Sequence, residues 1–295
     1  MSSESSGPHI FDTNVLRIVC ISDTHDEDFR GAVPDGDILL HTGDFTDYGG
    51  QKEMNQAFEW IRSLPHLVKV LVAGNHDLGL DPGHKAFDAS VLQLFTSREA
   101  HEHGIYYLNQ ETRTVAYFKR PDSREPLPLM VYGNPSQPDF LNTNPYAFTY
   151  SPSPSPEAAK AWKSAPDRNQ GVQIWATHGP PDKRLDWIDI PRLRGCIAQA
   201  QAVAQARPLL CVFGHYHVSN GIELVRWKYG SDEIDSAQVL STAASPRKCT
   251  FSSVDDGKGD LVPGRQTLFV NAAYMTSRKR EVSKRNSPFI ITLEL

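Results

Sequence analysis

The chain has few of the residues that mark several common protein classes. It contains only 4 cysteines among 295 residues, and Cys20, Cys196, Cys211 and Cys249 lack the close spacing of a zinc-binding motif. Most of them lie in or beside apolar stretches, so we expect reduced thiols in a cytoplasmic protein. The opening residues MSSESSGPHIFDTN have neither a basic start nor an apolar stretch, and we therefore expect no secretory segment.

Long hydrophobic runs and an excess of positive charge are also missing. A membrane-spanning helix needs about 18 or more consecutive apolar residues, and the chain has no such run, so we expect no membrane partner. The formal net charge of −5 argues against a nucleic acid partner. A basic run at 276–285 leaves access to the nucleus open, although a solvated loop is the favoured interpretation. With 39% hydrophobic residues, the composition is that of a globular protein with a sizeable core.

Short apolar runs recur along the chain, and each one ends in polar residues. These runs cover residues 15–23, 37–44, 68–77, 172–179 and 208–217. They are apolar on both faces, which is typical of strands covered by helices. Amphipathic helical patterns lie between them at 49–64 and 190–207. The alternation of strand and helix indicates an α/β architecture.

The domain organisation follows from the same pattern. We expect a flexible N-terminus over residues 1–14 and a single domain over residues 15–295. The stretches at about 119–156 and 228–266 are proline-rich or weakly patterned, and we interpret them as irregular insertions that flank the site and select substrates. The later apolar runs, including GIELVRW and PFIITLEL, would suit a second, more antiparallel sheet.

The polar ends of the runs carry residue types that bind metal ions. They are Asp23 and His25, then Asp44, then Asn75 and His76, then His178, and finally His215 and His217. Each ending alone has an ordinary interpretation as a turn or a helix cap. Their coincidence predicts a metal cluster, because ligand sites in open α/β sheets form beyond the carboxyl ends of the strands. Mixed imidazole and carboxylate ligands suit Zn, Mn, Fe or Ni better than Mg or Ca.

These motifs resemble the calcineurin-like metallophosphoesterase superfamily in their order and spacing. The matching motifs are D-x-H at 23–25, G-D at 43–44, G-N-H-D at 74–77, T-H-G-P-P at 177–181 and G-H-x-H at 214–217. CISDTH, GDILLHTGDFT and the late VNAAY are similar to the metallophosphoesterase-domain-containing branch, a brain-type branch that resembles class III phosphodiesterases. The resemblance implies a four-layer α/β/β/α sandwich, in which two mixed β-sheets are flanked by helices.

The resemblance also implies a dinuclear centre. We expect two divalent metal ions, with Mn²⁺ first and Fe, Zn or Ni as alternatives. One ion would be held by Asp23, His25 and His217, the other by Asn75, His178 and His215, and Asp44 would bridge them. In some members of the branch a glycine stands in place of the first histidine of the last motif. His215 is present here, so neither metal site is weakened in that way.

Further roles are implied outside the ligand set. His76 would donate a proton to the leaving group, and Asp47 would set its carboxylate against His76. Arg184 follows THGPPDK and is a candidate for binding the substrate phosphate, with a surface salt bridge as the alternative.

The sequence therefore predicts a metal-dependent phosphoric ester hydrolase. Its partner would be a small phosphodiester or phosphomonoester, nucleotides included, attacked by a metal-bridging hydroxide. A Ser/Thr phosphoprotein phosphatase and a non-catalytic metal-binding scaffold are the alternatives. The metal pair, the physiological substrate and the oligomeric state stay open.

Overall fold

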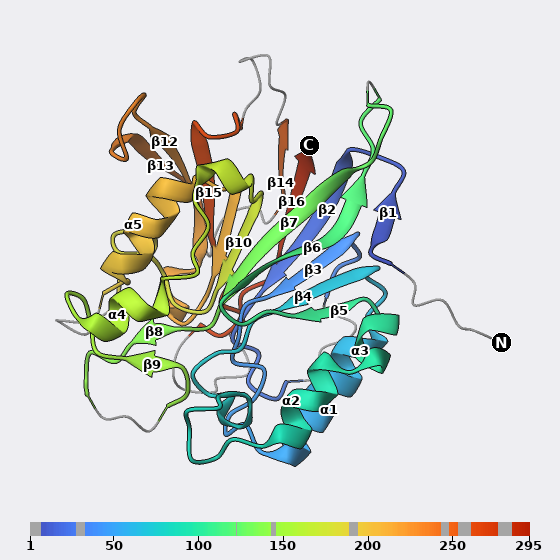
Figure 1. The fold of residues 1–295 in the computed structure, drawn as a ribbon, viewed down its shortest axis with the longest axis vertical. Helices are drawn as coiled ribbons and strands as arrows, with labels where there is room; N and C mark the ends of the chain where they lie inside the picture. The colour runs from blue at the N-terminus through green and yellow to red at the C-terminus, as the bar shows by residue number, and fades with distance from the viewer. Residues whose placement is uncertain are drawn as a thin grey trace.

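The computed structural model describes residues 7–27, 33–121, 123–142, 146–188, 194–242, 248–252, 261–276 and 285–295. Within these ranges, two mixed β-sheets lie face to face, and helices cover the outer face of each (Figure 1). This arrangement confirms the four-layer α/β/β/α sandwich. None of the helices in the described part of the chain has the length and apolar character needed to cross a bilayer.

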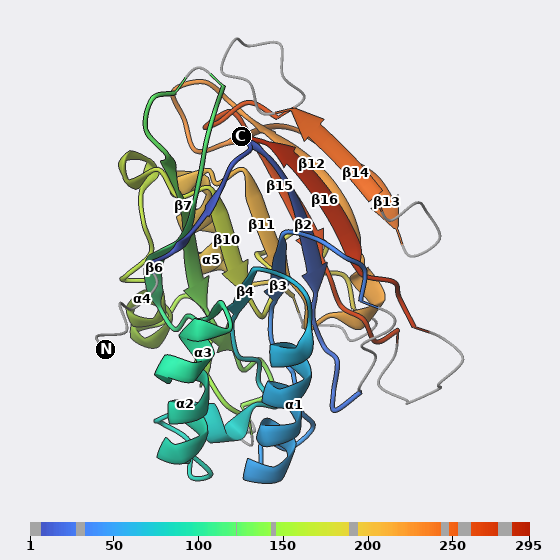
Figure 2. The ribbon, with the colours of Figure 1, turned by 90° about the vertical axis from the view of Figure 1, so that its right-hand side faces the viewer.

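The first sheet contains the three early apolar runs of the sequence. Its strands in the described residues follow the order β14 (Lys248–Ser252), β16 (Phe289–Glu294), β2 (Val15–Ile21), β3 (Ile38–His41), β4 (Val68–Leu71) and β5 (Ile105–Tyr107). Figure 2 shows β2, β16 and β14 side by side. The outer face is covered by α1 (Gln51–Ser63), α2 (Ala89–Thr96) and α3 (Arg98–Glu102), as seen in Figure 1.

The second sheet contains the two later runs that end in histidine. Its order over the described ranges is β1 (His9–Phe11), β6 (Glu111–Phe118), β7 (Leu127–Asn134), β10 (Ile174–Thr177), β11 (Leu210–Phe213), β15 (Gln266–Asn271), β12 (Gly221–Trp227) and β13 (Ile234–Thr242). Its outer face is covered by α4 (Pro156–Ala161) and α5 (Ile197–Ala206). A separate pair of short strands, β8 (Gln137–Pro138) and β9 (Thr149–Tyr150), lies near α4.

The strand pattern explains why both faces are apolar. Successive side chains of a strand point to opposite faces. Leu39 of β3 belongs to the buried cluster that includes Phe58 of α1, whereas Leu40 belongs to the cluster that includes Val212 of β11. A third cluster, which includes Trp175 and Val203, fills the space between the second sheet and its helices. The strands are therefore buried on both sides, and their carboxyl ends are positioned by three packed layers of side chains.

The two stretches predicted as irregular contain regular strands. Residues 127–134 form β7, which pairs with β6 on one side and β10 on the other. Pro128 argued against a strand here, because proline lacks the N–H that a strand donates. It precedes the part of β7 that pairs with β10, so no hydrogen bond between these two strands is lost. Residues 234–242 likewise form β13. Parts of the two stretches, 122, 143–145, 243–247 and 253–260, lie outside the described residues.

Other expectations about chain organisation also differ from the structure. Within the expected flexible N-terminus, His9–Phe11 pair with β6 as an edge strand, while residues 1–6 lie outside the described ranges. The late strands do not form a sheet of their own. In the second sheet β15 pairs with β11 and β12 pairs with β15, whereas β16 pairs with β2 in the first sheet. These pairings are long-range and leave no local signature in the sequence.

The turn at 228–233 lies at the end of β12 opposite to His217, beside the beginning of β15. It follows β12, which begins at Gly221 and runs away from His217. The buried Arg207 holds this region by donating to the carbonyls of Lys228 and Gly264. The expectation that residues 228–266 flank the site is therefore wrong for this turn.

Candidate metal centre

The polar ends of β2, β3, β4, β10 and β11 converge at one edge of the sandwich. In the described residues, three groups of side chains could each hold a cation: Asp23, His25 and His217; His25, Asp44 and His76; and Asp44, His178 and His215. The ligand atoms within a group lie within 4.8 Å of one another. Because His25 and Asp44 are shared between groups, the three groups form one continuous cluster.

Asp23 anchors the first group. His217 Nε2 lies 3.2 Å from its Oδ1, and the main-chain N–H of His215 donates to its Oδ2 over 3.0 Å. Burial acts to raise the pKa of Asp23, but the charge and hydrogen bond of His217 hold this pKa below its ordinary value. Asp23 is therefore ionised at neutral pH, as a metal ligand must be.

His178 and Asn75 belong to the second group. His178 Nδ1 lies 2.8 Å from the main-chain oxygen of Thr42, which can only accept, so Nδ1 carries the proton. His178 Nε2 then faces Asn75 Oδ1 at 2.9 Å and Asp44 Oδ2 at 3.4 Å. Burial acts to lower the pKa of His178, but Asp44 raises it to about 9. The ring of His215 lies 5.0 Å from that of His178.

The donor set fits a divalent cation. Ligands about 2.0–2.2 Å from one ion lie roughly 3–3.5 Å from each other, which matches the spacing around His178 Nε2. Because Asp44 raises the pKa of His178, a proton on Nε2 faces the oxygens of Asn75 and Asp44, and a divalent cation bound here would take the place of that proton. Burial, and next the neighbouring His178, lower the pKa of His215 to about 3, so this imidazole is neutral and able to coordinate.

Asp44 lies between the two predicted metal sites. Its Oδ2 is 3.6 Å from His25 Nε2 and 3.4 Å from His178 Nε2, while its Oδ1 accepts the main-chain N–H of His76 at 2.9 Å. Burial acts to raise the pKa of Asp44, but His178 first, and then His76, hold this pKa well below its ordinary value. A carboxylate that is ionised at neutral pH and shared by histidines from opposite sheets has the position of a bridging ligand.

Asp47 occupies a different place from the one predicted. Its carboxylate Oδ1 lies 3.2 Å from His25 Nδ1, whereas His76 Nδ1 lies 2.7 Å from its main-chain oxygen. The main-chain N–H of Asp47 donates to the carboxylate of Asp26, and this contact helps to orient the turn. The predicted contact between the Asp47 carboxylate and His76 is thus replaced by a main-chain hydrogen bond.

Arg184 is held in an ion pair outside the cluster. Its Nη1 lies 3.0 Å from Oε1 of Glu223 on β12, and the two side chains are only 14% and 11% exposed. Burial raises the pKa of Glu223, although the charge of Arg184 acts against this shift. The geometry matches the salt-bridge alternative, in a largely buried form, rather than a free side chain that could bind a substrate phosphate.

The backbone of the cluster is unusual where the ligands are attached. Asp23, His25, Asp44 and His215 have left-handed φ angles of 58°, 46°, 53° and 65°, a conformation that is uncommon for residues other than glycine and clusters at functional sites. Gly74 and Gly214 serve a different purpose. A Cβ atom at either position would collide with the carboxylate of Asp44 or Asp23, respectively. These glycines allow the carboxylates to approach the chain closely.

The sequence left two residues near the cluster without a role. Asp77, the last residue of G-N-H-D, is fully buried and accepts hydrogen bonds from the N–H groups of Gly74 at 2.7 Å and Thr46 at 3.1 Å. Burial, and next the charge of Asp44, raise the pKa of Asp77 to about 7. Its place in the motif was a signal for this structural role. Tyr146, whose ring lies 5.2 Å from that of His76, had no such signal.

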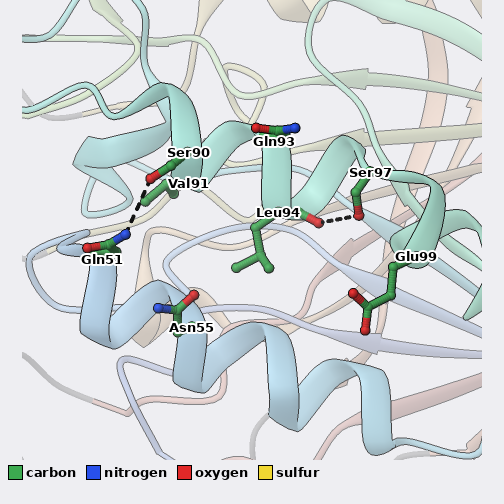
Figure 3. A pocket seen from close by; sticks show the side chains of 8 residues that line it. All are labelled: Gln51, Asn55, Ser90, Val91, Gln93, Leu94, Ser97 and Glu99. Atoms are coloured by element: carbon green, nitrogen blue, oxygen red, sulfur yellow. Dashed lines mark hydrogen bonds between the residues drawn. The ribbon is translucent and has the colours of Figure 1, made fainter.

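A cavity elsewhere on the surface is separate from this cluster. It measures about 290 Å³ and lies between α1 and α2, where Gln51 donates to Ser90 over 3.4 Å (Figure 3). The described side chains that line it, Asn55 and Leu94 among them, include none of the predicted site residues. The metal-binding geometry therefore resides at the strand ends rather than in this cavity.

Comparison with known proteins agrees with the motif pattern. Residues 16–219 match the family described as calcineurin-like phosphoesterase. Human metallophosphoesterase domain-containing protein 1 is 32% identical over 212 residues, which make up 70% of this chain and 62% of that protein. The probable rhamnogalacturonate lyase C of Emericella nidulans is 32% identical over 220 residues, which make up 72% of this chain but only 18% of that protein.

The chain thus spans less than two thirds of the length of these two relatives. Among solved structures, TT1561 of Thermus thermophilus is similar with a TM-score of 0.43 and 15% identity, over 68% of this chain and 81% of that one. The match to residues 16–219 covers most of the 295 residues and includes every residue of the cluster. This chain belongs to the calcineurin-like phosphoesterase family.

Proposed function

We propose that this protein is a metal-dependent phosphoesterase that hydrolyses a small phosphodiester or phosphomonoester, nucleotides included. The observation that carries the proposal is the position of Asp44, whose Oδ2 lies within 3.6 Å of His25 Nε2 and His178 Nε2. One carboxylate is thereby shared by ligand groups from both sheets. Family membership supports the general reaction, and the chemistry of the donor set supports a pair of metal sites.

The residues divide into two ligand sets that share one member. Asp23, His25 and His217 would hold one ion, Asn75, His178 and His215 the other, and Asp44 both. Divalent ions bound there supply Lewis-acid charge to the phosphate oxygens and activate water for in-line attack. Manganese is our first choice, with iron, zinc and nickel as alternatives, because the ligands mix imidazole with carboxylate.

His76 has the role of proton donor in this proposal. Its Nδ1–H is directed at the main-chain oxygen of Asp47, 2.7 Å away, which fixes the orientation of the imidazole. Nε2 is then the nitrogen left to give a proton to the leaving oxygen. The main-chain N–H of His76 donates to Asp44, so the donor is tied to the bridging carboxylate through the backbone.

Two other functions remain as outcomes of the test. A phosphoprotein phosphatase would use the same centre on a larger substrate. A non-catalytic scaffold would bind metal without turnover, and the full set of ligands together with His76 argues against it. We also propose a cytoplasmic location, which is supported by the four free thiols of Cys20, Cys196, Cys211 and Cys249. The net charge of −5 favours a small phosphate ester over nucleic acid as the partner.

Metal analysis combined with a substrate screen tests the proposal. The purified protein would be assayed for metal content, then with bis(p-nitrophenyl) phosphate, p-nitrophenyl phosphate, cyclic nucleotides and phosphopeptides. We expect turnover of at least one small ester, its loss on chelation and partial recovery with Mn²⁺. Activity on phosphopeptides alone would favour the protein phosphatase. Absence of turnover with every divalent ion would overturn the enzyme and leave the scaffold.

A further inference from the structure

An exposed aromatic ring lies directly against the candidate proton donor. The ring of Tyr146 is centred 5.2 Å from that of His76, with the ring planes tilted by 50°. Tyr146 is 40% exposed, so much of its ring faces solvent beside His76. Single exposed aromatic side chains are common on protein surfaces. The contact with His76 makes this one relevant to the reaction.

The chain around Tyr146 is fixed to the site by its neighbours. The main-chain N–H of Ala147 donates to the main-chain oxygen of Asn75 over 3.0 Å, and that of Phe148 donates to Oδ2 of Asp81 over 2.6 Å. Ala147 and Phe148 are both buried. The ring of Tyr146 therefore belongs to a segment that is docked on the Asn75–His76 turn.

The ring of Tyr146 lies near the place where the leaving group of a bound phosphate ester is expected. A general acid must lie within hydrogen-bond reach of the leaving oxygen, so that oxygen would lie beside His76. The group attached to the leaving oxygen would then lie near His76, within reach of the neighbouring ring of Tyr146. Aromatic side chains bind flat, apolar groups by stacked or edge-to-face contacts.

We infer that Tyr146 forms a leaving-group subsite and gives the enzyme a preference for esters whose leaving group is a flat aromatic ring. The inference rests on the proposed phosphoesterase function and names the class of substrate that this site would favour. Tyr146 contacts the substrate before and during the reaction alike, so its ring lowers KM and has little effect on kcat. Its effect thereby differs from that of His76, which acts on the chemical step.

The experiment compares two esters whose leaving alcohols have similar acidity but differ in shape. Phenyl and hexafluoroisopropyl phosphates would each be prepared as the monoester and as the methyl diester, and kcat and KM measured with the Mn²⁺-loaded full chain. For Tyr146→Ala we expect KM for the phenyl ester to rise by about two- to tenfold, the range for one aromatic contact. The hexafluoroisopropyl ester should be affected little, and Tyr146→Phe should behave like the wild type.

Tyr229→Ala provides a matched control. Tyr229 is also an exposed tyrosine, 84% exposed, but it lies after β12 and packs against Arg265. Its removal should leave KM unchanged for both esters. Metal content and thermal melting of each variant would establish that the fold and the centre are intact.

Two results would overturn the inference while leaving the phosphoesterase in place. Equal losses on both esters would mean that Tyr146 acts through His76 or the fold, and unchanged KM values would mean that it contacts no leaving group. If the metal-loaded wild type hydrolysed no phosphate ester at all, the proposed function would fail and the inference with it.

Discussion

The main-chain oxygen of Asp47 lies 2.7 Å from Nδ1 of His76. The carboxylate of the same residue lies 3.2 Å from Nδ1 of His25. One residue thus orients two imidazoles, the candidate proton donor through its backbone and a candidate metal ligand through its side chain. A side-chain substitution would remove the second contact and keep the first, so the two functions can be separated by experiment.

Asp47→Ala should weaken metal binding rather than proton donation. The main-chain oxygen that holds His76 is kept, whereas His25 loses the carboxylate that orients it. Loss of such a partner of a metal ligand typically costs about 10–100-fold in metal affinity. Titration of the metal-free variant with Mn²⁺ would measure the change, and kcat at saturating metal should stay near that of the wild type. A loss of kcat that persists at saturating metal and depends on the leaving group would contradict this division.

His76→Gln should retain both metal ions and lose turnover. Contributions of general acids are typically about 10²–10⁴-fold in rate, and we expect kcat for an alkyl ester to fall by that factor. The loss should be much smaller for p-nitrophenyl esters, because this leaving group departs without a proton. Rates measured over a series of leaving groups, together with metal content, test the prediction. Metal loss in this variant would instead make His76 a ligand, as its contact group with His25 and Asp44 allows.

Asp44→Asn should lower metal occupancy itself. The neutral amide removes the negative charge that lies between His25 and His178, and so each metal site loses a ligand. We expect fewer than two equivalents of bound metal after dialysis, together with loss of phosphoesterase turnover. Elemental analysis of the dialysed protein measures the first quantity. Full occupancy by two ions would show that Asp44 is not a bridge.

Arg184→Met should destabilise the fold rather than impair phosphate binding. It leaves Glu223 largely buried without its partner, and breaking a buried pair costs about 3 kcal/mol or more. Urea unfolding would measure the loss, and the double variant Arg184→Met/Glu223→Leu should recover much of it. A folded double variant with a greatly raised KM for phosphate esters would instead place Arg184 in the substrate site.

The same variant should show a defined dependence on pH. Burial raises the pKa of Glu223 in the folded chain, and loss of Arg184 removes a charge that opposes this shift. Between the unfolded and folded pKa values the folded state binds more protons, so stability falls as pH rises through that window. The stability of Arg184→Met relative to wild type should therefore be better at pH 5 than at pH 8. A larger deficit at pH 5 would reverse the assigned sign.

Local patterns in the sequence were sufficient to predict which side chains the structure brings together at the strand ends. Each candidate ligand follows a short strand that is buried on both faces. The apolar run indicated the strand, and the polar residues at its end indicated the candidate metal site. Local patterns did not predict contacts between side chains that are far apart in the sequence. Glu223 lies 39 residues from Arg184, and no local pattern indicates that the two side chains meet.

The errors around Asp47 and β7 have related physical causes. The motif predicts that Asp47 lies next to His76. Whether the carboxylate or the main-chain oxygen of Asp47 contacts His76 depends on the backbone conformation, which the motif does not give. β7 was not predicted because of Pro128. A proline disrupts a strand only where its missing N–H would have bonded to a neighbouring strand, and this depends on the pairing in the folded sheet. Tyr146 lies beside His76 in the folded chain, where the N–H of Ala147 donates to the main-chain oxygen of Asn75, and no local sequence pattern indicates this contact.

The ligands come from both sheets, with Asp23, Asp44 and Asn75 after strands of one sheet and the histidines after β10 and β11 in the other. Asp23 and His215 are 192 residues apart in the chain. Each proposed metal site takes residues from both sheets, so an ion would be bound completely only after the two sheets have packed together. Bound ions would link the two sheets, and each would add about 2.7 kcal/mol to the stability when free metal exceeds its dissociation constant a hundredfold. In the proposed enzyme, metal supply would therefore set the stability of the folded chain as well as its rate of turnover.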